Sequence, residues 1–128
     1  ESASTGTFAF NAAPAVTIDT ARRAFTQGDL PGSLNAYWEY IARNPGDIDA
    51  RGELGNVYLL SGNVQEAAQT YYELSKMLID QNQPDLVPAL LPVIAMVNPD
   101  QADELMDMMF WFRQQFYENQ PDQVPGQG

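Results

Sequence analysis

Residues 48–81 read IDARGELGNVYLLSGNVQEAAQTYYELSKMLIDQ, and this pattern predicts two short helices joined by a tight turn. The turn falls at Gly62 and Asn63, because glycine and asparagine adopt a positive φ at little energetic cost. Gly55 in the first helix and Ala67 in the second have little or no side chain, so the two helices can approach each other closely there. Larger side chains fill the remaining space between the helices: Leu54, Tyr58 and Tyr71.

This pattern resembles one tetratricopeptide repeat, a helix–turn–helix unit of 34 residues. The positions that match are Leu54-Gly55, Tyr58, Ala67 and Tyr71. The resemblance implies a fold built from stacked helix pairs and a function in protein–protein recognition. It does not identify the partner.

A weaker copy of the pattern occupies residues 14–47, at a constant offset of 34 residues. Its first helix carries smaller residues than the family prefers, so we expect thinner packing in this terminal repeat. Pro45 stands where the closing proline of a repeat is expected, and it ends the preceding helix. Several pairs recur in register: Gly28-Asp29 with Gly62-Asn63, Tyr37-Trp38 with Tyr71-Tyr72, Ser33 with Ala67, and Ala21 with Gly55.

The period breaks after Gln81, but residues 84–97 keep apolar side chains at helical spacing. We expect one helix there, with Asp85 as its cap, Pro88 in its first turn and a kink at Pro92 in its interior. Asn98 and Pro99 then open a last helix, which should run to about Asn119.

The sequence and the resemblance together predict an all-α fold, a right-handed α-solenoid of about three antiparallel helix pairs with a degenerate last pair. The helical domain spans residues 14–119 and comprises the repeats 14–47 and 48–81 and the degenerate pair 82–119. We expect residues 1–13 to form a flexible segment and residues 120–128 a disordered tail.

Composition argues against several classes of function. The chain has 17 acidic and 6 basic residues, and its net charge of -11 disfavours binding to nucleic acid or to an anionic membrane. It has no His and no Cys, and it lacks the glycine-flanked serine of hydrolases and a glycine-rich phosphate loop. We therefore expect no catalysis, no cofactor and no bound metal. The acidic clusters near Asp47 and Asp103 lack the spacing of a calcium loop and are typical of helix starts.

The resemblance also implies a binding groove, because the first helices of the pairs line a concave surface in this family. Asn56 matches the asparagine that hydrogen-bonds the backbone of a bound peptide in many members. Arg22 is the only cation at the positions that clamp a carboxylate, which disfavours chaperone-tail binding. The alternative is that the chain's own tail or a second copy covers this surface. The groove residues implied are Ile18, Arg22, Phe25, Asn56, Leu59, Leu86, Leu90 and Val93.

The last predicted helix carries more apolar surface than one neighbour can bury, since its apolar residues span about 200° of the helical wheel. Leu105, Met108, Met109, Phe112 and Phe116 form the central face. We expect the flank beside it to contact another protein, most simply a second copy, unless Phe8 and Phe10 or the loose tails of the same chain cover it. This flank comprises Met106, Phe110 and Tyr117, with Trp111 at its rim.

The expected function is that of an adaptor or scaffold, which binds a peptide or a helix of a partner in a bacterial envelope assembly. The alternative is a structural module for self-association, which yields a homo-oligomer without a separate peptide ligand. The chain starts with Glu1 and the polar stretch ESASTGTF, as expected for a fragment or a processed product. A periplasmic or membrane-anchored location is favoured over a cytoplasmic one, and no segment is long enough to insert into a membrane.

Overall fold

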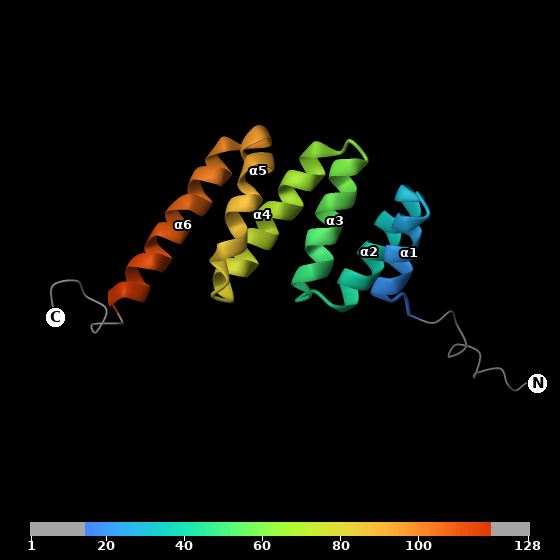
Figure 1. Ribbon diagram of the computed structural model, residues 1–128, viewed down its shortest axis with the longest axis horizontal. Coiled ribbons are helices and arrows are strands. Elements are labelled where there is room, and N and C mark those ends of the chain that lie inside the picture. Colours follow the sequence, from blue (N-terminus) through green and yellow to red (C-terminus); the bar gives the residue numbers. More distant parts are fainter. Residues whose placement is uncertain (1–14, 119–128) are drawn as a thin grey trace, which may run out of the picture. The chain divides into compact units, whose positions relative to one another are not determined.

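The computed structural model describes residues 15–118, which form six α-helices, one 3-10 helix and no strand (Figure 1). The predicted all-α class is therefore confirmed. These residues fall into two compact units, and the boundary between them lies between Gly46 and Asp47. The expectations for residues 1–13 and 120–128, including Phe8 and Phe10, lie outside the described residues.

The first unit contains α1 (Ile18–Thr26) and α2 (Leu30–Arg43), which pack against each other. Gly28 makes the turn between them with a φ of 82°, as the repeat pattern predicted. Asp29 starts α2, because its carboxylate accepts a hydrogen bond from the backbone N–H of Gly32. The buried hydroxyl of Ser33 donates a hydrogen bond of 2.9 Å to the carbonyl oxygen of Ala21. The pair of small residues thus lies where the two helices meet.

The second unit begins with α3 (Ile48–Leu60) and α4 (Val64–Asp80), joined by a turn in which Gly62 has a φ of 83°. The side chain of Asp47 caps α3 by accepting a hydrogen bond of 3.0 Å from the N–H of Ala50, which confirms the predicted cap. The ring of Tyr71 lies directly over Gly55, where no side chain is in the way. This contact brings the two helices together.

The segment after α4 differs from the prediction. It forms a 3-10 helix, η2 (Pro84–Ala89), and then a separate short helix, α5 (Leu91–Val97). The predicted single helix over residues 84–97, with a kink at Pro92, is therefore wrong. Pro92 has no N–H to continue a helix and its ring would clash with the turn before it, so it lies in the first turn of α5. Asp85 is also wrong as a cap, since η2 follows Gln83 and has no side-chain cap.

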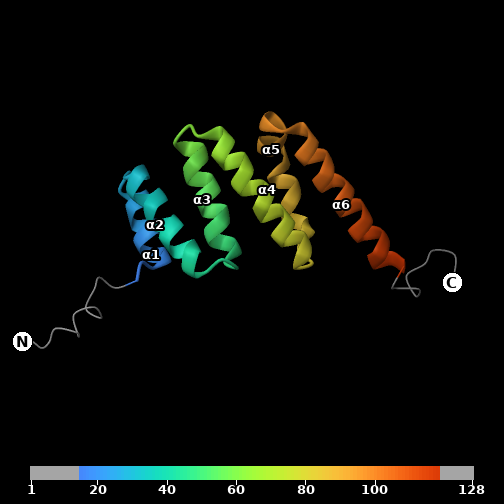
Figure 2. The ribbon, with the colours of Figure 1, turned by 180° about the vertical axis from the view of Figure 1, so that it is seen from behind.

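The last helix, α6 (Pro99–Glu118), begins as predicted, because the Asn98 side chain accepts a hydrogen bond of 3.2 Å from the N–H of Gln101. It packs against α4 and α5, and both views show it diverging from η2 toward its C-terminal end (Figures 1 and 2). The core of the second unit joins α4, η2, α5 and α6. Its buried members include Leu74, Leu78, Val87, Ile94, Ala102 and Leu105.

Two fully buried serines differ in their hydrogen bonding. Ser33 donates to Ala21, as described above, whereas the hydroxyl of Ser75 on α4 has no hydrogen-bond partner among the described residues. A buried hydroxyl without a partner loses its bonds to water and gains none in return. We therefore expect opposite effects when each hydroxyl is removed.

Ser75→Ala is expected to raise the free energy of unfolding by about 1 kcal/mol, because it removes an unsatisfied hydroxyl and supplies a better helix former. Ser33→Ala is the matched control, and it should lower the free energy of unfolding by about 0.5–1.5 kcal/mol because its hydrogen bond is lost. Urea denaturation followed by circular dichroism measures both. Effects of the same sign and size would contradict the difference in hydrogen bonding.

Candidate functional site

Large hydrophobic side chains are exposed on α6, where Met106, Phe110 and Tyr117 follow one flank of the helix and Trp111 lies at the rim, beside the acidic residues. The exposed fractions are 47% for Met106, 53% for Phe110, 63% for Trp111 and 56% for Tyr117. We call these four residues the α6 aromatic flank. The rings of Phe110 and Trp111 contact each other edge to face, with 5.7 Å between their centres. The four side chains that the sequence analysis predicts as a contact surface are thus exposed on the second unit, among residues 15–118.

Two features leave these side chains exposed: they lie off the buried face of α6, and α6 is longer than α5, which packs against it. α6 has 20 residues and α5 has 7, which correspond to lengths of about 30 Å and about 10 Å. The N-terminal half of α6 is anchored by Ala102 and Leu105, which are buried. Phe116 lies on the same face as Leu105 but is 49% exposed. The apolar face therefore continues beyond the part of the helix that the core covers.

An open groove runs between η2 and the C-terminal half of α6. It has a volume of about 800 Å³. Pro84 and Pro88 line it from η2, and Phe112 and Phe116 line it from α6. Asp85 and Arg113 also line it, so both signs of charge are present at this groove.

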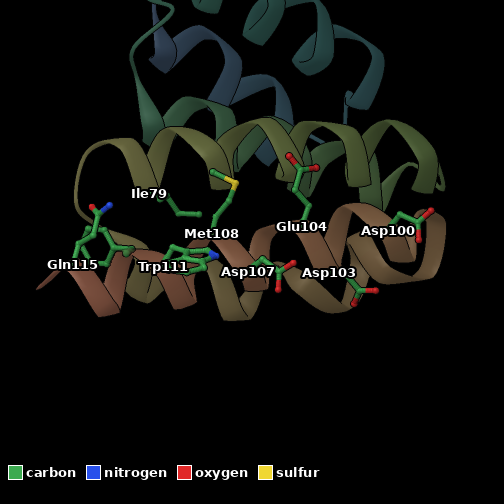
Figure 3. A pocket seen from close by; sticks show the side chains of 9 residues that line it. Ile79, Asp100, Asp103, Glu104, Asp107, Met108, Trp111 and Gln115 are labelled. Carbon is green, nitrogen blue, oxygen red and sulfur yellow. The ribbon is translucent and has the colours of Figure 1, made fainter. Parts of the chain in front are cut away.

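A second open groove, of about 610 Å³, lies between α4 and α6 (Figure 3). Ile79 of α4 and Met108 of α6 point toward each other between the helices. Trp111 lies farther along α6, next to the carboxylates. Four acidic residues form a row along α6 at this groove: Asp100, Asp103, Glu104 and Asp107. No group of three such side chains in residues 15–118 is arranged to hold a metal ion.

The two helices are linked beside this groove by a hydrogen bond. The hydroxyl of Tyr72 on α4 donates to a carboxylate oxygen of Glu104 on α6, at 2.7 Å. This bond raises the pKa of Tyr72, because the ionised phenolate could no longer donate it. Lys76 Nζ lies 5.1 Å from the centre of the Tyr72 ring. Glu104 is therefore held in place by a phenol that stays protonated at neutral pH.

The groove residues implied by the resemblance have different environments. In the first unit Ile18 is half-buried, while Arg22 and Phe25 are exposed. In the second unit Asn56, Leu59 and Leu86 are exposed, whereas Leu90 and Val93 pack against the core.

The side-chain oxygen of Asn56 accepts a hydrogen bond from the hydroxyl of Tyr71. Burial raises the pKa of Tyr71, so that hydroxyl remains a donor. The amide of Asn56 is thus oriented by its own chain.

Sequence reasoning missed the groove between α4 and α6. Its acidic residues were interpreted as charges at a helix start. The signal in the sequence is the spacing, because residues 100, 103, 104, 107, 111 and 115 share one face of a helix. What the spacing does not reveal is which neighbour lies beside that face.

None of the described helices combines the length and the apolar character that crossing a bilayer requires. The chain was also compared with known proteins. Neither the family models, nor the curated proteins, nor the solved structures gave a significant match.

Proposed function

We propose that the chain is a non-catalytic helical interaction domain of the tetratricopeptide type, which binds a helix or a peptide of a partner protein through its C-terminal helix. The observation that carries this proposal is the α6 aromatic flank. Side chains of Trp, Tyr, Phe and Met are enriched in protein interfaces. Four of them on one helix, each between 47% and 63% exposed, go beyond the singly scattered apolar residues of an ordinary surface.

The repeat pattern supports the same proposal. Two copies in register at an offset of 34 residues, each with a positive-φ glycine in its turn, are what a stack of helix pairs requires. We infer from them a right-handed α-solenoid of antiparallel pairs, with α5 and α6 as its degenerate last pair. The absence of His and Cys from the sequence is in keeping with a role in binding.

Self-association is the second candidate, and the same flank favours it. A twofold dimer pairs one patch with the same patch of a second copy, and exposed apolar residues gathered on one helix suit that arrangement. Sedimentation velocity separates the two candidates. A monomer at high concentration favours the adaptor, and a tight homodimer favours the self-association module.

Phe110→Asp is expected to abolish the contact, because it places a charge among residues that would be desolvated in the interface. A photo-crosslinker at position 110 would first identify the bound protein, whether a partner or a second copy. The affinity of that purified protein should then fall at least about tenfold with Phe110→Asp, as expected for an interface hot spot.

Leu60→Asp is the matched control. Leu60 is also apolar and is 64% exposed, but it lies at the end of α3. This variant should keep the parent affinity, and circular dichroism should show unchanged helicity for both variants. Equal affinities of the parent and of Phe110→Asp would move the binding site away from the α6 aromatic flank.

A further inference from the structure

The groove between α4 and α6 combines an apolar floor with a carboxylate wall. Ile79 is buried, and Met108 and Phe112 are partly buried beside it. The α6 side of the groove extends from Asp100 to Gln115, a length of about 22 Å along the helix. That length corresponds to about four turns of a second helix lying alongside.

The charge at this groove has one sign. Asp100, Asp103, Glu104 and Asp107 line it, and no Lys or Arg is among its lining residues. Lys76 of α4 does not line the groove; its ammonium group lies over the ring of Tyr72. The carboxylates of Asp103 and Asp107 lie on the open side of α6 (Figure 3). The field over the groove therefore attracts cations.

We propose that this groove binds a cationic amphipathic helix of the partner protein, a proposal that rests on the proposed function and specifies the partner's chemistry. Lys or Arg side chains of that helix would pair with Asp103 and Asp107. One or two of its apolar side chains would pack on Met108 and Phe112, since methionine adapts its shape to a partner. Trp111 would receive a cationic head on its exposed ring face.

Charge complementarity favours this partner over the other two occupants considered. A second copy would bring its own row of carboxylates toward this one, and like charges repel each other across an interface. Residues 1–14 (ESASTGTFAFNAAP) and residues 119–128 (NQPDQVPGQG) carry no Lys or Arg that could pair with the carboxylates. A partner with a basic helix supplies both the charge and the apolar anchor.

The probe is a synthetic helical peptide of about 18 residues, with Leu along one face and Lys and Arg on both flanks of that face. A second peptide keeps the Leu pattern and replaces every Lys and Arg with Glu. Fluorescence anisotropy with the full chain should show that the cationic peptide binds at least about tenfold more tightly than the acidic one. The affinity for the cationic peptide should weaken as salt rises, because salt screens exposed charges.

The decisive variant is the pair Asp103→Asn and Asp107→Asn. It should weaken cationic-peptide binding about tenfold and flatten its dependence on salt. The matched control is the pair Asp19→Asn and Glu39→Gln, which changes the net charge equally in the first unit and should keep the affinity within about twofold.

A third readout uses Trp38→Phe, which leaves Trp111 as the only tryptophan of this sequence. Its emission should shift to shorter wavelength when the cationic peptide binds.

An equal loss with both pairs would show that the peptide responds to net charge alone, and it would overturn the site. An unchanged Trp111 emission on saturation would do the same. Either result, together with partner binding that still depends on Phe110, would reject the cationic helix and leave the proposed function standing. Loss of the Phe110 dependence alone would instead reject the proposed function.

Discussion

Leu105→Ala should lower the free energy of unfolding of the second unit by about 2–5 kcal/mol. Leu105 is fully buried and belongs to the core that joins α4, η2, α5 and α6. Truncation removes apolar contact and leaves a cavity that the surrounding helices only partly fill. Because Leu105 and Ala102 are the two buried residues of α6, this change acts where the helix is held.

Met106→Ala is the control for Leu105→Ala, since Met106 is the next residue on the same helix and is 47% exposed. Its effect should stay within about 0.5 kcal/mol. Both variants are best built on Trp38→Phe, so that Trp111 fluorescence follows the second unit during urea denaturation. Similar effects of the two truncations would mean that α6 does not pack through Leu105.

Gly55→Ala should lower the free energy of unfolding by about 1–3 kcal/mol, although alanine is the better helix former. A Cβ at position 55 would lie 2.3 Å from Cε1 and 2.7 Å from Cδ1 of Tyr71. The Tyr71 ring is buried, and its hydroxyl is bonded to Asn56, so it has little room to move. The clash would separate α3 from α4 or displace that ring.

Gly52→Ala provides the matched control in the same helix. A Cβ there would lie 3.5 Å from Leu74 Cδ2, which is an ordinary contact. This variant should raise the free energy of unfolding by about 0.5–1 kcal/mol through helix propensity alone. Thermal and urea denaturation measure both variants, and a stabilising effect of Gly55→Ala would show that the helices do not close on that glycine.

Much of the helical layout could be predicted because local chemistry determines it. The turns at Gly28 and Gly62 need a positive φ, and the caps at Asp47 and Asn98 satisfy backbone N–H groups at helix starts. Residues 84–97 could not be predicted in the same way. Their apolar spacing suits one helix, but the choice between a kink and a break depends on how Pro92 packs in the folded unit.

The candidate site was predicted in part. The wheel of α6 placed Phe110 and Tyr117 beside the central face, and they are exposed. The wheel also placed Phe116 on the central face, but it is half exposed because it lies beyond the part of α6 that the core covers, which no local pattern reveals. Beside the groove between α4 and α6, Tyr72 contacts Glu104; these residues are 32 positions apart, and no local pattern encodes their pairing.

The part of α6 that extends beyond α5 carries exposed aromatic residues, and their presence has an evolutionary implication. Exposed aromatic residues in the second half of α6 add nothing to the core, and Glu, Lys or Gln would form a helix more readily there. Such replacements would also reduce the tendency of the chain to aggregate. Selection for stability or solubility alone would therefore favour a polar surface at Phe110, Trp111 and Tyr117. An advantage gained when this part of the helix is covered by another molecule would account for side chains that the isolated domain does not need.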